Sequence, residues 1–61
     1  MTWTEQQAAE RLGVSRFTLR AWRQQGRGPA FLKLGRAVRY RPADLDAYEE
    51  AVLVRPRPAV G

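Results

Sequence analysis

The 61-residue chain contains neither cysteine nor histidine. Disulfides and the usual zinc ligand sets, which stabilise many domains of this size, are therefore excluded. Catalytic groups are equally scarce: Ser15 has no histidine to activate it, and Asp44 and Asp46, two residues apart on a predicted helix, diverge in direction. We expect a non-enzyme that uses no metal ion and no cofactor.

Long apolar runs are also missing. No segment approaches the roughly 18–20 apolar residues that span a bilayer, and residues 1–5 do not have the features of a secretory signal. The lack of cysteine fits a reducing compartment. We therefore expect a cytoplasmic protein without a membrane segment. Its length allows one domain with a thin core, because a chain of about 60 residues buries only about 60% of its unfolded surface.

Acidic residues are absent from one long segment. Residues 15–41 hold eight basic side chains and no acidic one, whereas residues 42–54 hold four acidic side chains and no basic one. The fold should therefore have a cationic surface formed by residues 15–41 and an anionic surface behind it, formed by residues 42–54. This asymmetry indicates a polyanionic partner, nucleic acid first and an anionic membrane surface second. A charged surface that is merely solvated is the alternative.

Four arginines of the basic segment follow a helical rhythm. Arg16, Arg20, Arg23 and Arg27 are separated by four, three and four residues, which places them in one stripe along an α-helix. Like charges at these spacings destabilise a helix by roughly 0.2–0.5 kcal/mol per pair. We predict that a polyanion neutralises the stripe when the protein is bound to its partner.

Two helices are predicted in the first half of the chain. Thr4 and Gln7 have the spacing of a capping box, and Gly13 is a natural helix stop. Ser15 then caps a second helix that runs from Arg16 to about Gln25. Two helices joined by a tight turn that contains glycine are the layout of a helix-turn-helix.

A β-hairpin and a third helix are predicted in the second half. Residues 31–34 and 37–40 form two short strands that turn at Gly35 and Arg36. An isolated ribbon is marginally stable, so it should pack on the helices. Pro42 then suits the first position of a helix that extends to about residue 53.

The third helix should bury one stripe and expose its acids. Leu45, Tyr48 and Val52 recur at spacings of three and four, which predicts that all three point inward. The predicted fold class is mainly α with a small β-hairpin, a winged helix-turn-helix of order α-α-β-β-α. It spans residues 1–54, and residues 55–61 are predicted to be a disordered Arg/Pro tail.

Three stretches carry a resemblance to a known family: VSRFTLRAW at residues 14–22, PAFLKLGR at 29–36 and RPADLDAY at 41–48. Together they resemble the small excisionase and AlpA-like winged-helix proteins, a branch of the MerR-type DNA-binding domain. The resemblance implies that the second helix enters the major groove and that the hairpin is a wing reaching the minor groove or the backbone. Some relatives carry polar base-reading residues where this chain has Phe17 and Ala21.

Arginine suits such an interface because its guanidinium can make two hydrogen bonds to a phosphate or to guanine. We expect Arg16 and Arg20 to read base edges, Arg23 and Arg27 to contact phosphates, and Arg36 to enter a minor groove. Gln24 could bind adenine and Phe17 a thymine methyl group. The predicted DNA-binding residues are Ser15, Arg16, Phe17, Thr18, Arg20, Ala21, Arg23, Gln24, Arg27, Lys33, Arg36, Arg39 and Arg41.

The predicted function is that of a sequence-specific architectural protein, a phage excisionase that binds and bends attachment-site DNA. Its partners would be double-stranded DNA, an integrase, and other copies of the chain arranged head to tail on DNA. Two alternatives stay open: a small transcriptional regulator of the same fold, and a protein-interaction adaptor that uses the acidic third helix.

Overall fold

The computed structural model describes residues 1–56 and contains three helices and three strands. Their order is β1 (Trp3–Thr4), α1 (Glu5–Leu12), α2 (Arg16–Gln24), β2 (Leu32–Leu34), β3 (Ala37–Tyr40) and α3 (Pro42–Val52). The predicted winged helix-turn-helix is confirmed, with β1 as an additional strand. The last five residues of the predicted tail, 57–61, lie outside the described residues, and the domain boundary at residue 54 stays a prediction.

The ends of α1 and the start of α2 follow from local hydrogen bonds. The Thr4 hydroxyl accepts a hydrogen bond from the Gln7 amide at 3.1 Å, and the Gln7 side chain accepts one from the Thr4 amide at 2.9 Å. Gly13 ends α1 with φ 72°, a left-handed conformation that glycine adopts at little cost. The Ser15 hydroxyl accepts from the Thr18 amide at 3.0 Å and caps α2. Helix α2 ends at Gln24, one residue earlier than predicted.

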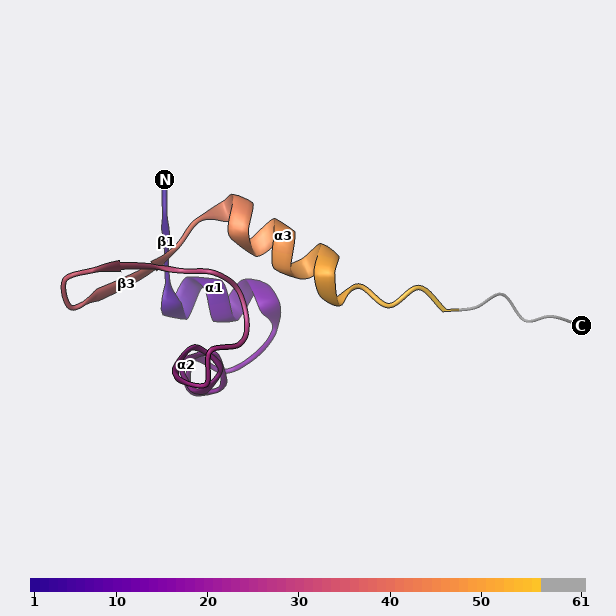
Figure 1. Ribbon diagram of the computed structural model, residues 1–61, viewed down its shortest axis with the longest axis horizontal. Coiled ribbons are helices and arrows are strands. Elements are labelled where there is room, and N and C mark those ends of the chain that lie inside the picture. The colour runs from indigo at the N-terminus through magenta and orange to yellow at the C-terminus, as the bar shows by residue number, and fades with distance from the viewer. Residues whose placement is uncertain (57–61) are drawn as a thin grey trace, which may run out of the picture.

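The wing is anchored by a third strand. The sheet order is β1-β3-β2, both pairs are antiparallel, and Trp3 lies opposite Tyr40 while Lys33 lies opposite Val38. The chain immediately before α1 therefore pairs with the wing, and the β2–β3 hairpin projects from one side of the helices (Figure 1). A two-stranded ribbon is marginally stable, and this third strand fixes the wing relative to α1.

The core is small and takes one or two side chains from each helix and one from the sheet. Within residues 1–56, five hydrophobic residues are buried to 2% exposure or less and form the core: Ala8, Ala9, Leu19, Tyr40 and Leu45. Both tryptophans are half-buried at the edge of this cluster. Alanines on α1 let α2 approach closely, so that Leu19 can reach the centre.

No helix within residues 1–56 is long and apolar enough to cross a bilayer.

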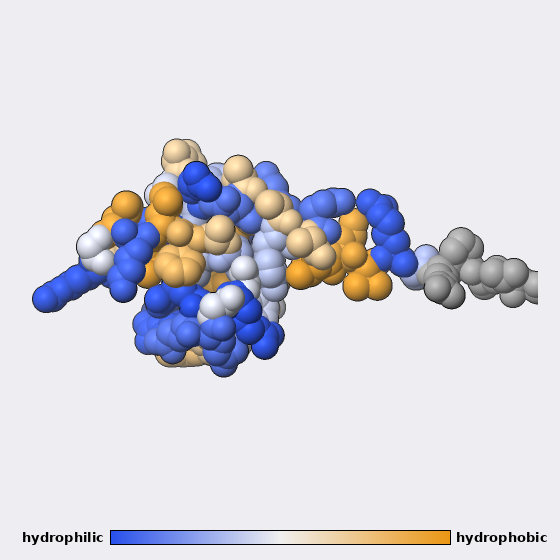
Figure 2. Space-filling model, in the orientation of Figure 1, coloured by the Kyte–Doolittle hydropathy of each residue, from blue (hydrophilic) through white to orange (hydrophobic). Residues whose placement is uncertain are grey.

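The last turn of α3 departs from the prediction. Leu45 is buried and Tyr48 is half-buried, but the Val52 residue is 53% exposed, so the prediction that it points inward is wrong. Helix α3 runs past the end of α1, where no other helix or strand of residues 1–56 covers it (Figure 1). Val52 and the exposed Leu53 and Val54 form an apolar patch at this end of the molecule (Figure 2).

Candidate nucleic-acid interface

Helix α2 buries one side chain completely and presents a long polar face to solvent. Leu19 points into the core, whereas the exposed side chains of α2 and the turn after it form a hydrophilic surface (Figure 2). On α2, its N-cap and the turn after it, the exposed residues among those predicted to bind DNA are Ser15, Arg16, Phe17, Arg20, Gln24 and Arg27. Thr18 and Ala21 are half-buried beside them. The first turn of α2, after the Ser15 cap, also carries backbone N–H groups without a helical acceptor, which can bind an anion.

The sequence suggested that the positive charges of the arginine stripe have no acidic partner. In the structure, Glu5 is the partner of one of them. Arg23 Nε donates a hydrogen bond to Glu5 Oε2 at 2.9 Å, and both side chains are less than a fifth exposed. This hydrogen bond raises the pKa of Arg23 above its ordinary value. The phosphate contact of Arg23 stays a prediction; in this structure its partly buried guanidinium pairs with Glu5 and joins α2 to α1.

The first turns of α1 supply acceptors to two further arginines of the stripe. Arg20 Nε lies 3.7 Å from Glu5 Oε1, and Arg16 donates to the Gln6 side chain at 3.4 Å. Both arginines remain exposed. Glu5 was missed in the sequence analysis because a carboxylate in the first turn of a helix is sufficiently explained by the helix dipole. Its pairing with α2 arises from helix packing.

The basic residues of the wing differ in their surroundings. Arg36 and Lys33 are exposed, with Arg36 in the turn between β2 and β3. Arg39 is half-buried, and its guanidinium donates to the Val38 carbonyl at 2.8 Å. Arg41 pairs with Asp44 through two hydrogen bonds of 2.5 and 3.0 Å, which lowers the pKa of that carboxyl. The wing thus offers Lys33 and Arg36 most directly to a partner.

A cleft of about 340 Å³ separates α2 from the wing. We call it the arginine cleft, because five arginines from the two elements line it: Arg16, Arg20, Arg23, Arg36 and Arg39. Its remaining lining comes from the start of α1 and from β3. Residues 16–23 and 36–39 are distant in the sequence, and the tertiary structure brings their cations to one side of the molecule.

Several predicted residues lie outside the arginine cleft. Ser15 and Phe17 line a neighbouring hollow with Arg16, whose guanidinium carbon is 5.1 Å from the centre of the Phe17 ring. The Arg27 guanidinium carbon lies 5.6 Å from the centre of the Trp22 ring, beyond the end of α2. Lys33, Arg41, Thr18, Ala21 and Gln24 do not line the cleft either. The candidate interface is therefore the exposed face of α2 together with the tip of the wing.

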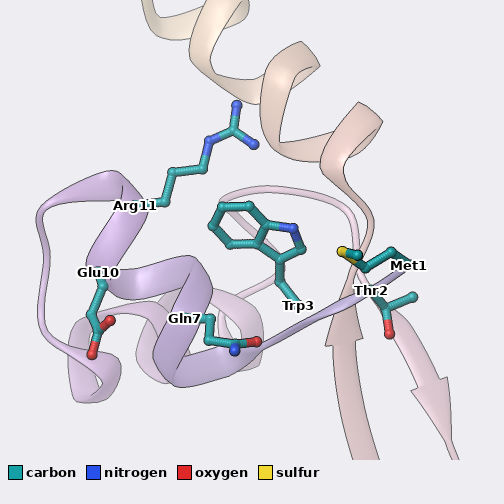
Figure 3. A pocket seen from close by; sticks show the side chains of 6 residues that line it. All are labelled: Met1, Thr2, Trp3, Gln7, Glu10 and Arg11. Carbon is teal, nitrogen blue, oxygen red and sulfur yellow. The ribbon is translucent and has the colours of Figure 1, made fainter.

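A second cluster of charges joins α1 to α3. Arg11 extends from α1 toward α3 above the Trp3 indole (Figure 3), with its guanidinium carbon 5.3 Å from the ring centre. It donates to Glu49 at 2.6 Å and pairs also with Asp46, which raises the pKa of Arg11. Arg11 thus engages two of the four acids of α3. Within residues 1–56, no cluster of three or more potential ligand side chains could hold a metal ion.

Comparison with known proteins identifies the domain type. A family model described as a helix-turn-helix domain matches residues 4–52, which run from the N-cap of α1 to the last residue of α3. The match therefore includes both walls of the arginine cleft. Comparisons with curated proteins and with solved structures gave no match.

Proposed function

This chain belongs to the helix-turn-helix domain family, of the small excisionase and AlpA-like kind, and is a DNA-binding protein; on that premise we propose that it is a phage excisionase. In this role it recognises a duplex sequence beside an attachment site, bends it, and promotes excision by an integrase. The proposal gives the chain a binding role without catalysis, in the cytoplasm of the bacterial host.

The arginine cleft is the observation that supports this function most directly. A major groove admits an α-helix, and the adjacent minor groove is separated from it by a single sugar–phosphate backbone. When α2 occupies the major groove and the wing tip reaches the minor groove, that backbone runs between α2 and the wing. The cleft between these elements carries Arg16, Arg20, Arg36 and Arg39 in addition to the ion-paired Arg23, and these positive charges suit a phosphate strand.

The exposed face of α2 supplies side chains for base readout. Arg20 is the central candidate because it is exposed and lies on the wall of the cleft. Arginine can make two hydrogen bonds to guanine, and Gln24 can make two to adenine. Phe17, 64% exposed, offers an apolar surface for a thymine methyl group. This combination supports recognition of a sequence beyond general attraction to DNA.

Bending explains why several copies would act together. Bending 20–30 base pairs by 40–90° costs on the order of 1–6 kcal/mol, whereas a single small module buries only about 600–1,000 Å² on DNA. Neighbouring copies arranged head to tail would share that cost. Arg11 already pairs with Asp46 and Glu49, which leaves less of the acidic surface of α3 for such a contact.

Replacing Arg20 by alanine tests base readout. We expect Arg20→Ala to weaken binding to a duplex selected from a random library by about 1–3 kcal/mol, measured by fluorescence anisotropy. The affinity of this variant for random duplex should fall much less. Arg55→Ala is the control, because Arg55 is 80% exposed and lies beyond the end of α3. Equal losses on both duplexes would assign Arg20 to the backbone.

Excision itself is tested in a reconstituted reaction. The purified protein is added to an integrase and DNA that carries the attachment sites flanking an integrated phage. We expect excised circles only when the protein is present, together with a bend in the bound duplex detected by gel mobility of phased sites. Binding without stimulation of excision, accompanied by repression of an overlapping promoter, would indicate a transcriptional regulator instead.

A further inference from the structure

Among residues 1–56, Glu5 is the one acidic side chain that lines the arginine cleft. It lies in the first turn of α1 and is 17% exposed. Its two carboxylate oxygens face two arginines of α2, Arg23 at 2.9 Å and Arg20 at 3.7 Å. The Tyr40 hydroxyl of β3 donates to it at 3.4 Å. One carboxylate therefore connects α1, α2 and the wing.

A carboxylate at this place opposes the approach of a phosphate strand. Phosphate contacts supply most of the affinity for DNA of any sequence, so an acidic group in the cleft weakens non-specific binding directly. Glu5 also keeps Arg23 from contacting DNA, because that guanidinium would have to leave a largely buried ion pair to reach a phosphate. Both effects, the repulsion of phosphate by Glu5 and the retention of Arg23, are independent of the base sequence.

The same carboxylate restrains Arg20. This side chain is 55% exposed, and arginine loses considerable rotamer entropy when it is fixed by a ligand. Attraction to Glu5 favours the conformers of Arg20 that lie along the cleft wall, so less entropy is lost when Arg20 meets a base edge. The benefit applies only where a matching base is present.

From these contacts we propose that Glu5 is a specificity-determining positioning residue: it lowers affinity for random DNA and preserves affinity for the recognised sequence. The proposal rests on the DNA-binding function above and adds to it a residue outside the exposed face of α2. A purely structural role, in which Glu5 only braces the fold, predicts the opposite sign, because a loosened fold weakens binding to every duplex.

The test compares Glu5→Gln with wild type on two duplexes, one selected from a random library and one of random sequence. Glutamine keeps the shape and can still accept a hydrogen bond from Arg23, but the negative charge is lost. We expect affinity for random duplex to rise about three- to tenfold, and the slope of log affinity against log salt to steepen by about one, as one more phosphate is contacted. Selectivity for the chosen duplex should fall about fivefold or more.

Glu50→Gln is the matched control. It makes the same change in net charge, but Glu50 is 76% exposed near the end of α3 and does not line the cleft. We expect its salt slope and its selectivity to equal those of wild type. If the control reproduces the changes seen with Glu5→Gln, net charge alone explains them and the proposal is overturned.

A second variant keeps the test informative if Glu5→Gln unfolds. The double variant Glu5→Gln/Arg23→Gln removes both members of the ion pair, retains the net charge and allows an amide–amide hydrogen bond. Arg20 has lost its carboxylate here as well, so selectivity should again fall about fivefold or more. Selectivity equal to that of wild type in a folded variant, or parallel losses on both duplexes, would refute the role of Glu5. Failure of wild type to bind duplex DNA would instead refute the proposed function.

Discussion

The affinity of the protein for duplex DNA is expected to fall about a thousandfold between 50 and 200 mM salt. Each phosphate neutralised by a basic side chain contributes about −0.9 to the slope of log affinity against log salt. Six basic residues of α2, the turn after it and the wing have no carboxylate of residues 1–56 within hydrogen-bonding distance: Arg16, Arg20, Arg27, Lys33, Arg36 and Arg39. A slope near −5 over a fourfold change in salt gives this loss.

The measurement is a fluorescence anisotropy titration on random duplex at four or more salt concentrations. Arg23 and Arg41 are left out of the expected slope because each is hydrogen-bonded to a carboxylate at less than 3 Å. Arg55→Ala should leave the slope unchanged, since Arg55 lies beyond α3. A slope near zero would contradict an electrostatic interface on α2 and the wing.

Truncating Leu19 to alanine is expected to remove most of the stability of the domain. Leu19 is fully buried where α1, α2 and the sheet meet, and it is one of five core residues. A buried leucine replaced by alanine costs about 2–5 kcal/mol, whereas a domain of this size has only about 3–5 kcal/mol in total. The free energy of unfolding in urea, followed by tryptophan fluorescence, measures the loss.

Leu34→Ala provides a matched control for the core variant. The substitution is the same, but Leu34 is 57% exposed near the tip of the wing, so we expect a change of less than about 0.5 kcal/mol. Comparable losses in the two variants would show that stability is not concentrated in the core that Leu19 occupies. DNA binding by the Leu34 variant should remain close to wild type.

The contacts of α3 bear on the adaptor alternative, which stays a prediction. Its predicted docking surface was the acidic face of this helix, but Arg11 engages both Asp46 and Glu49 and ties α3 to α1. Asp44 is likewise paired with Arg41. Because three of the four acids have partners inside the domain, the helix presents much less free negative charge than its sequence suggests.

Local signals in the sequence were sufficient to define the helices and the hairpin turn. The capping box of Thr4 and Gln7, the left-handed Gly13 and the Ser15 cap involve residues no more than four apart, so the chain encodes them wherever it is placed. The segregation of basic and acidic residues along the chain likewise indicated a polyanionic partner before any fold was known. In the helix caps, the residues that contact each other are also neighbours in the sequence.

Features that join distant residues could not be obtained in this way. The strand β1 forms only because Trp3 pairs with Tyr40 across the sheet. Val52 is exposed because the last turn of α3 extends beyond the end of α1. Sequence spacing shows which side chains share a face, but not which face of another element lies opposite.

The sequence by itself determined the helix ends, the hairpin and a row of arginines on α2, because short-range geometry and helical periodicity fix all three. The tertiary structure alone decided which arginines remain available to a partner. Glu5 and Arg23 are 18 residues apart, and Arg11 and Glu49 are 38 apart. Such ion pairs depend on the packing of whole helices, which is set by the shared core and not by the pattern of charges along the chain.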